Sequence, residues 1–317
     1  MRFAFKTAPQ HTTWAEMLAV WQAADDIEVF ESGWTSDHFY PMHGADLSGP
    51  RLEGWTTLAA LAQATRRLRL GVLVTGIHYR QPAVLANMAA ALDIVSGGRL
   101  ELGIGAGWYQ PEYDAAGIAF VAAGQRIARL DESLSIIRRL LAGTPVNHTS
   151  DFYRIDGLDL DVLPTPRPSS PRLLVGAGGP RMLRLAARHA DIVGVLPAPI
   201  RDSTDSDDPR DRLPPAFDTK IGVVREAAGD RFGSLEINAF GTFIMTGKRR
   251  AETAELIVRR GWTGIEVEAV WQMPTIFIGS PDQIRSDLQA RRERFGLSYL
   301  VAGEDNLPVL AEIVGGL

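Results

Sequence analysis

The sequence has no cysteine among its 317 residues, and this absence excludes several kinds of chemistry at once. Without a thiol the chain cannot form disulfides, bind zinc or an iron–sulfur cluster through thiolates, or attack a substrate with a cysteine nucleophile. A chain without disulfides suits a reducing compartment, and the segment from Met1 to Lys6 lacks the apolar core of a secretory signal. We therefore expect a cytoplasmic protein.

Long apolar runs and an excess of positive charge are also missing. No stretch reaches the roughly 18 apolar residues that a membrane-spanning helix needs. Lysine and arginine number 33 against 38 aspartate and glutamate residues, and the net charge of -5 lacks the electrostatic footprint of a nucleic-acid-binding protein. These absences predict that neither a membrane nor a nucleic acid is a partner.

The order of apolar and amphipathic segments predicts the fold. Hydrophobic residues make up 45% of the chain and charged residues 22%, which provides enough apolar surface for a large core. Short apolar runs alternate with helix-length amphipathic segments from end to end, as in a parallel sheet whose strands are joined by helices. Eight such units favour a closed barrel over an open doubly wound sheet, which usually has about five or six strands. The predicted fold is an α/β (β/α)8 TIM barrel, in a single domain over residues 1–317.

Each expected unit consists of a strand and the helix that follows it. The predicted ranges, strand first, are 2–7 with a helix from about 13, 28–36 with 54–66, 68–75 with 82–95, 99–103 with 125–141, 172–176 with 180–189, 191–196 as a strand alone, 235–246 with 251–260, and 298–301 with 306–314. A further helix is expected to begin after Ser280.

Local patterns support several of these helices. Thr13 and Glu16 have the spacing of a capping box at the first helix, and Ser280 and Gln283 have it at the additional one. The helix predicted over 82–95 has one apolar face that is expected to cover the sheet. That face consists of Leu85, Met88, Ala89, Leu92 and Val95.

Two segments interrupt the alternating pattern. Residues 146–159 predict a small hairpin with a turn at Asp156 and Gly157. Residues 201–215 are rich in Asp, Ser and Pro and predict an inserted solvated loop or lid. Its aspartates lack the spacing of a calcium loop, and the histidines of the chain lack the spacing of zinc ligands. We therefore expect no bound metal.

The clearest candidate binding site is the glycine-rich turn from Gly176 to Pro180. A strand, a glycine turn and a helix with proline at its first position place free N–H groups and the positive end of the helix dipole around an anion such as phosphate. The alternative is an ordinary tight turn. A dinucleotide fingerprint is incomplete, because Arg181 stands where its third glycine is required. The second glycine run, Gly103 to Gly107, fails likewise at Trp108, and we interpret it as a place where a flat ring approaches the backbone.

A second candidate lies at the end of the second predicted strand, where Asp37 precedes His38. In a barrel the carboxyl ends of the strands form the active site, and a carboxylate beside an imidazole there can act as a tuned acid or base. Turn or capping chemistry is the alternative. After the third strand, Arg80 could bind an anionic ligand, stay solvated or form a salt bridge.

These stretches together resemble the luciferase-like monooxygenase superfamily, in particular its branch that uses the deazaflavin coenzyme F-420. The resemblance extends in order over nearly the whole chain and is weakest across 201–215. The matching segments are 36–39, 52–55, 71–82, 98–108, 175–180 and 278–281.

The resemblance implies a place for each part of the coenzyme at the mouth of a (β/α)8 barrel. Asp37 and His38 match a pair beside the deazaflavin ring, with His38 as acid/base or electrostatic partner and Asp37 orienting it. The peptide between Leu73 and Val74 matches a bulge, often cis, that supports the ring. The other implied contacts are Thr75, Gly105 and Ala106 at the ring edge and Ala177, Gly178 and Gly179 at the phosphate. The resemblance also implies a homodimer.

One departure from the family pattern concerns the substrate. Sugar-phosphate dehydrogenases of this branch carry a proton-donating glutamate after the second glycine run, where this chain has Trp108. Their basic residues for a substrate phosphate are also not evident. Trp108 in the substrate pocket therefore suggests an apolar or flat small-molecule substrate.

The resemblance implies an enzyme that transfers a hydride between F-420 and an organic substrate. The alternatives are a monooxygenase that uses reduced FMN and oxygen, a catalytically silent flavin-binding protein, and a cofactor-free barrel that binds phosphate. Retention of both Asp37 and His38 disfavours the silent protein.

Overall fold

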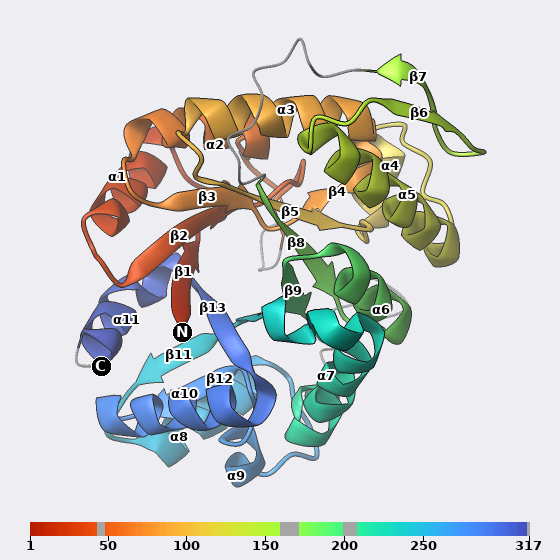
Figure 1. Cartoon of the computed structure of the whole chain (residues 1–317). Helices are drawn as coiled ribbons and strands as arrows, with labels where there is room; N and C mark the ends of the chain where they lie inside the picture. Colours follow the sequence, from red (N-terminus) through yellow and green to blue (C-terminus); the bar gives the residue numbers. More distant parts are fainter. Residues whose placement is uncertain (43–47, 159–170, 199–207, 316–317) are drawn as a thin grey trace. The chain divides into compact units, whose positions relative to one another are not determined.

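The computed structural model describes residues 1–42, 48–158, 171–198 and 208–315 (Figure 1). Its strands include the eight that the sequence predicts and several short additional ones. The strands are β1 (Arg2–Lys6), β2 (Phe30–Thr35), β3 (Arg69–Val72), β4 (Thr75–Gly76), β5 (Leu100–Gly105), β6 (Val146–Thr149), β7 (Arg154–Leu158), β8 (Arg172–Ala177), β9 (Ile192–Val195), β10 (Glu236–Phe240), β11 (Thr242–Met245), β12 (Ile276–Gly279) and β13 (Leu297–Gly303).

Parallel pairing closes the main sheet. Its strand order is β3-β2-β1-β13-β10-β9-β8-β5-β4, and β3 also pairs with β5, so that eight strands form a ring. The registers run parallel, for example Leu70 opposite Leu100 and Ala4 opposite Val301. The predicted (β/α)8 barrel is therefore confirmed.

Helices follow the strands in the expected alternation. The α-helices are α1 (Trp14–Asp25), α2 (Gly54–Ala64), α3 (Pro82–Val95), α4 (Gln110–Ala115), α5 (Ala123–Leu141), α6 (Pro180–His189), α7 (Pro214–Ala228), α8 (Arg249–Arg259), α9 (Val267–Val270), α10 (Pro281–Phe295) and α11 (Leu307–Val314). Short 3-10 turns lie at η1 (Ile77–Tyr79), η2 (Pro209–Arg212), η3 (Gly229–Ser234) and η4 (Glu304–Asn306). No helix within the described ranges combines the length and apolar character needed to cross a membrane.

The chain divides into two compact units. Unit 1 contains residues 1–6, 26–31 and 177–317, and unit 2 contains residues 7–25 and 32–176. The prediction of one domain over the whole chain stays a prediction.

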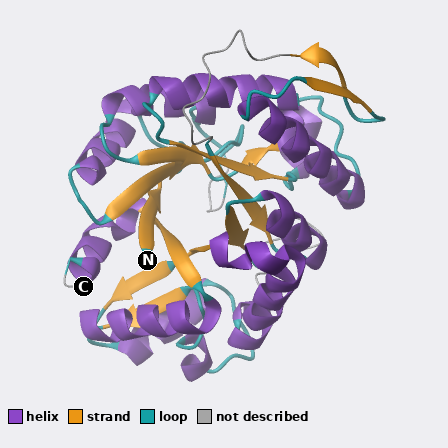
Figure 2. Ribbon diagram, viewed as in Figure 1, coloured by secondary structure: helices purple, strands orange, loops and turns teal. Residues whose placement is uncertain are grey.

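In unit 2, helices α2 and α3 pack against strands β3 and β5 (Figure 2). The apolar face predicted for α3 is mostly confirmed, since Leu85, Ala89 and Leu92 are buried. Val95 was expected on that face but is 50% exposed. It is the last residue of α3, where the chain turns away from the sheet through Ser96.

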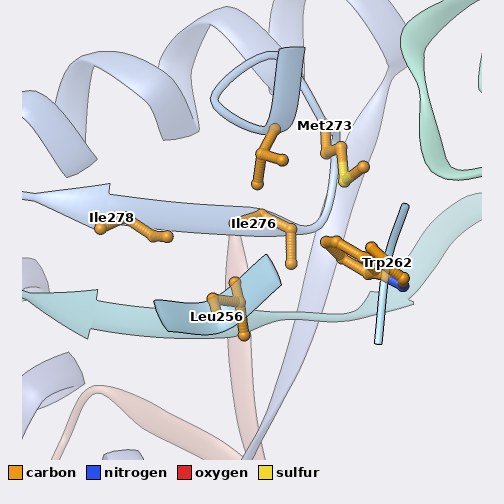
Figure 3. Packing of buried hydrophobic residues seen from close by; sticks show 6 residues of the cluster. Leu256, Trp262, Met273, Ile276 and Ile278 are labelled. Carbon is orange, nitrogen blue, oxygen red and sulfur yellow. The ribbon is translucent and has the colours of Figure 1, made fainter. Parts of the chain in front are cut away.

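Unit 1 contains a small sheet that the sequence analysis did not predict. The strand expected over 235–246 is broken at Gly241, whose N–H donates to the carbonyl of Val301 at 2.7 Å. The second half, β11, pairs in parallel with β12, and Phe243 stacks on Phe277. Figure 3 shows the core beside this sheet. Its buried residues are Leu256, Trp262, Val270, Met273, Ile276 and Ile278.

The two predicted capping boxes are confirmed. The Thr13 hydroxyl accepts from the Glu16 N–H at 3.2 Å, and the Glu16 carboxylate accepts from the Thr13 N–H at 2.7 Å. At α10 the same reciprocal bonds join Ser280 and Gln283. Helix starts are predictable here because both partners lie within one turn of each other.

The predicted hairpin is confirmed as β6 and β7, but its turn is elsewhere. The Ser150 N–H donates to the carbonyl of Tyr153, and the Ser150 hydroxyl accepts from the N–H groups of Phe152 and Tyr153. Gly157 instead lies within β7, with φ of 62°, opposite a register shift in β6. The glycine therefore serves a bulge, which needs the same positive φ as a turn.

The insertion expected over 201–215 is described only from residue 208. Residues 201–207 lie outside the described residues. The described remainder is not a solvated loop throughout, because η2 covers Pro209–Arg212 and α7 begins at Pro214. Lys220 of α7 donates to the Asp211 carboxylate at 2.6 Å, which fixes η2 on the helix.

Candidate functional site

The pair Asp37 and His38 follows β2 directly, as the sequence predicts for an active site. Asp37 is buried and the His38 side chain is 19% exposed. The two side chains pair with different charged groups.

Asp37 is held by Arg80. The Arg80 guanidinium donates to both Asp37 oxygens, at 2.7 and 3.3 Å, and to a Glu53 oxygen at 2.8 Å. Of the alternatives that the sequence left open for Arg80, the salt bridge is confirmed. Burial raises the pKa of Asp37, and the ion pair with Arg80 opposes this effect. Glu53 also caps α2, since its carboxylate accepts from the N–H groups of Trp55 and Thr56.

His38 is held by a residue that the sequence analysis missed. Its Nδ1 lies 2.8 Å from Oε2 of Glu112, a fully buried carboxylate on α4. Asp37 was expected to orient His38, but the imidazole is hydrogen-bonded to the Glu112 carboxylate instead. The helix α4 has six residues and was not predicted. Pro111 before Glu112 is a helix-start signal, but no local pattern pairs Glu112 with a residue 74 positions earlier.

Glu112 has a full set of hydrogen-bond donors. Its Oε1 accepts from the N–H groups of Phe39 at 2.7 Å and Tyr40 at 3.1 Å. Its Oε2 also accepts from the Tyr79 hydroxyl at 2.9 Å. Burial opposes ionisation of Glu112, yet the hydrogen bond and charge of His38, with the Tyr40 N–H and the Tyr79 hydroxyl, hold its pKa below the usual value. This carboxylate is therefore ionised at neutral pH.

One aromatic ring contacts the imidazole, and others lie in the adjoining segments. Trp108 meets the His38 ring edge-on at a centroid distance of 6.0 Å and is 43% exposed. Phe39 and Tyr40 are 40% and 45% exposed. Tyr79 lies between Phe39 and Tyr113, with centroid distances of 4.9 and 5.2 Å. The polar group of His38 therefore sits in a mainly apolar and partly exposed surface.

The third strand shows the bulge that the resemblance implied. The peptide between Leu73 and Val74 is cis, as predicted, and it separates β3 from β4. The Leu73 N–H donates to the carbonyl of Thr35 at 2.9 Å. Thr75 is fully buried and its hydroxyl accepts from the Trp55 indole at 2.8 Å. The Thr75 hydroxyl therefore has a hydrogen-bond donor within the protein, the Trp55 indole.

The glycine run on β5 has a packing explanation. A Cβ on Gly103 would lie 2.1 Å from the carbonyl oxygen of Val72, and a Cβ on Gly105 would lie 2.8 Å from a Val74 methyl group. Gly107 has φ of 73°, and a side chain there would overlap the Tyr113 hydroxyl. The sequence analysis interpreted this run as an approach for a flat ring. In the structure the missing side chains make room for neighbouring protein atoms.

The predicted anion turn lies in unit 1. Gly179 is the N-cap of α6, has no side-chain cap and precedes Pro180, and the first turn of α6 has no acidic residue. A Cβ on Gly179 would meet none of the described residues within 4 Å, whereas one on Gly178 would lie 2.2 Å from the carbonyl of Pro197. The Ala177 carbonyl accepts from Leu196. Among the described residues the turn therefore has open space at Gly179 and no side chain that caps the first N–H groups of α6, as an anion site requires.

The structure brings most of the predicted site residues together within unit 2. Those in unit 2 are Asp37, His38, Leu73, Val74, Thr75, Gly105, Ala106 and Trp108, and those in unit 1 are Ala177, Gly178 and Gly179. No group of three or more His, Asp or Glu side chains in the described part of the chain could hold a metal ion.

His78 lies near this site, and its burial leads us to expect that the stability of the protein depends on pH. Both ring nitrogens are buried, and within the described residues neither has a hydrogen-bond partner. Burial, with Arg129 and Arg126 nearby, lowers the pKa of His78 from 6.5 to about 4. Between these pH values the unfolded chain binds a proton that the native state does not, so stability falls as the pH drops from about 6.5 to about 4.

We expect His78 to contribute about 1–2 kcal/mol to this loss of stability. The contribution is smaller than the full pKa difference would give, because the side chain is partly exposed. The measurement is urea unfolding of wild type and His78→Gln at pH 7 and pH 4.5. The variant should lose less free energy of unfolding on acidification than the wild type. Equal losses in both proteins would contradict the assignment to His78.

Comparisons with known proteins show relatives that match a large part of the chain. A phthiodiolone/phenolphthiodiolone dimycocerosates ketoreductase from Mycobacterium sp. (strain JLS) is 33% identical over 72% of this chain and 60% of its own length. An F420-dependent glucose-6-phosphate dehydrogenase from Amycolatopsis mediterranei (strain U-32) is 33% identical over 51% of this chain and 47% of its own length. The matched region thus spans about half of the length of such relatives.

A solved structure supports the same architecture. An F420-dependent secondary alcohol dehydrogenase, in complex with an F420-acetone adduct, superposes with a TM-score of 0.75 at 16% identity, covering 99% of this chain and 97% of the other. At this identity the likeness shows the fold. The family model of the luciferase-like monooxygenases matches residues 1–206, well over half of the chain. The chain therefore belongs to the luciferase-like monooxygenase family.

Proposed function

We propose that this protein is an oxidoreductase that transfers a hydride between coenzyme F-420 and an organic small-molecule substrate. The observation that carries the proposal is His38, held through Nδ1 by a buried carboxylate and placed beside the partly exposed Trp108 at the end of β2. The relatives whose names specify F-420 and the family membership support the choice of coenzyme. The homodimer that the resemblance implies is part of the same proposal.

Residues of unit 2 fit one face of a planar ring. Leu73, Val74 and Ala106 are partly exposed and apolar, as a support for a deazaflavin requires. Thr75 and Gly105, which are proposed to line the ring edge together with Ala106, are buried. Asp37, with its charge compensated by Arg80, completes the predicted ring contacts.

Residues of unit 1 fit the coenzyme phosphate. Within the described part of the chain no side chain caps the start of α6, and the space at Gly179 leaves room for an anion near the first N–H groups of the helix. The absence of an acidic residue in the first turn of α6 avoids repulsion. Ala177, Gly178 and Gly179 are the residues proposed to hold the phosphate.

The chemistry divides between the coenzyme and the protein. When bound, the deazaflavin supplies or accepts the hydride. His38 gives a proton to the substrate oxygen during reduction of a carbonyl, or takes it during oxidation of an alcohol, so that hydride and proton balance. Trp108, Phe39 and Tyr40 form the partly exposed aromatic surface proposed to bind an apolar or flat substrate.

Parallel titrations with F-420 and FMN test the proposal. We expect F-420 to bind with a Kd from submicromolar to low micromolar, roughly −7 to −9 kcal/mol, and FMN to bind much more weakly. The readout is the fluorescence or absorbance of each cofactor. Tighter binding of FMN would favour the monooxygenase, and binding of neither would favour a cofactor-free barrel. F-420 binding without turnover on any carbonyl, alkene or alcohol tried would favour the silent protein.

A further inference from the structure

We propose that Glu112 is the positioning residue of His38, which fixes the imidazole with a proton on Nδ1 and leaves Nε2 as the reacting nitrogen. The proposal rests on the proposed function, because it names the nitrogen of His38 that exchanges a proton with the substrate. The structural part of the proposal, the position of the ring proton, can be measured without any coenzyme.

The hydrogen-bonding positions of the Glu112 carboxylate are all occupied. A carboxylate has about four lone-pair positions, and Glu112 meets four donors: the His38 ring, the N–H groups of Phe39 and Tyr40, and the Tyr79 hydroxyl. Its side chain is fully buried. Glu112 therefore holds both the His38 imidazole and the backbone N–H groups of the two residues that follow it.

The contact with Glu112 determines which ring nitrogen of His38 carries the proton. An ionised carboxylate can only accept hydrogen bonds, so the 2.8 Å contact requires that Nδ1 of His38 donates. The lowered pKa of Glu112 favours this ionised form at neutral pH. In the neutral imidazole only one nitrogen carries hydrogen, and Nε2 then holds the free lone pair. The tautomer follows from the charge of Glu112.

The negative charge of Glu112 acts directly on the His38 imidazole. When His38 takes up a proton, the positive charge forms 2.8 Å from a buried negative one, which stabilises the imidazolium. Asp37 also faces His38, but Arg80 compensates its charge at 2.7 Å. Glu112 is thus the carboxylate that contacts the imidazole directly.

The remaining groups around Glu112 define its electrostatic surroundings. The Arg51 guanidinium interacts with Glu112, Asp37 and Tyr79, and it donates to the carbonyl of Tyr40 at 3.0 Å. Tyr79 is neutral at any pH of interest, because burial, Tyr113 and the negative charge of Glu112 raise its pKa. Loss of the Glu112 charge is therefore the change to which His38 should respond most.

The test compares wild type with Glu112→Gln, which keeps the shape of the side chain and removes its charge. Nitrogen-15 NMR of histidine-labelled protein reads the tautomer of His38, assigned by its loss in His38→Gln. We expect the Nδ1-protonated tautomer in wild type and a mixture of tautomers, or the Nε2-protonated form, in Glu112→Gln. The Nε2-protonated tautomer in wild type would overturn the proposal whether or not the variant folds.

The kinetic readout separates positioning from simple structural support. We expect Glu112→Gln to lower kcat by roughly 10- to 100-fold with little change in the KM for F-420. The limb of the pH–rate profile that depends on His38 should move to lower pH, because a neutral amide does not stabilise the imidazolium. Glu112→Asp, which restores the charge, should return that limb toward its wild-type position.

Glu132 provides a matched control. It lies on α5 and holds His148 of the hairpin at 2.9 Å, a second glutamate–histidine pair in the same unit. Glu132→Gln should leave the tautomer of His38 and the pH profile unchanged. A pH limb that moves equally in both variants, or in neither, would overturn the proposal. Absence of F-420 turnover in wild type would instead refute the proposed function, while the NMR result would still decide the role of Glu112.

Discussion

Replacement of His38 by alanine is expected to lower turnover by roughly 10²- to 10⁴-fold, the usual contribution of a positioned acid or base. The alanine cannot exchange a proton with the substrate oxygen, and it leaves the Oε2 atom of Glu112 with the Tyr79 hydroxyl as its remaining side-chain donor. Coenzyme binding should be retained, since the ring and phosphate contacts proposed above do not depend on the imidazole.

The measurement is single-turnover hydride transfer with a substrate that the wild-type enzyme converts, together with an F-420 titration. His148→Ala is a suitable control, because that imidazole also contacts a glutamate but belongs to the β6–β7 hairpin. Near-normal hydride transfer in His38→Ala would leave His38 with a structural role alone. Loss of coenzyme affinity would instead place His38 among the binding residues.

Replacement of Gly179 by aspartate is expected to weaken F-420 binding by at least about 100-fold while leaving the fold intact. A Cβ at this position meets none of the described residues within 4 Å, and Gly179 has φ of −93°, which any residue can adopt. Aspartate is also a favourable N-cap, so the free energy of unfolding should stay the same or rise. Its carboxylate would occupy the start of α6 and repel the phosphate.

Gly179→Asn separates charge from shape in this test. Asparagine is nearly the same size and caps helices equally well, but it carries no charge and should retain much more affinity than aspartate. Gly178 is unsuitable for such a comparison, because a Cβ there would lie 2.2 Å from the carbonyl of Pro197. Unchanged F-420 affinity in a folded Gly179→Asp protein would refute the anion-site assignment.

Local sequence signals predicted most of the elements and several of their starts, but not α7 (Pro214–Ala228). The bounds of α3 and α6 agree with the ranges expected from the sequence, and the capping boxes at Thr13 and Ser280 have the bonds that their spacing implies. These features depend on residues within one turn of each other, so the sequence contains both partners in one window. The repeated strand–helix order likewise predicted the closed barrel.

Sequence patterns that are compatible with two different local structures were less reliable predictors. Asp156 and Gly157 predicted a turn, but Gly157 uses its positive φ in a bulge, and Ser150 closes the turn. The expected strand over 235–246 is divided at Gly241 because the chain pairs with β13 up to the Gly241–Val301 bond and with β12 from Thr242 onward. In both cases the pairing with another strand decided between conformations that the local sequence permits.

The sequence by itself determined the series of strands and helices, the positions of Asp37 and His38 at a strand end, and the glycine turn before α6. Only the tertiary structure decided which charges meet: Arg80 with Asp37, across 43 positions, and Glu112 with His38, across 74. Hydrogen bonds within a turn follow from backbone geometry, whereas partners from different strands and helices become neighbours only when the barrel closes. For that reason the imidazole was predictable and the carboxylate that holds it was not.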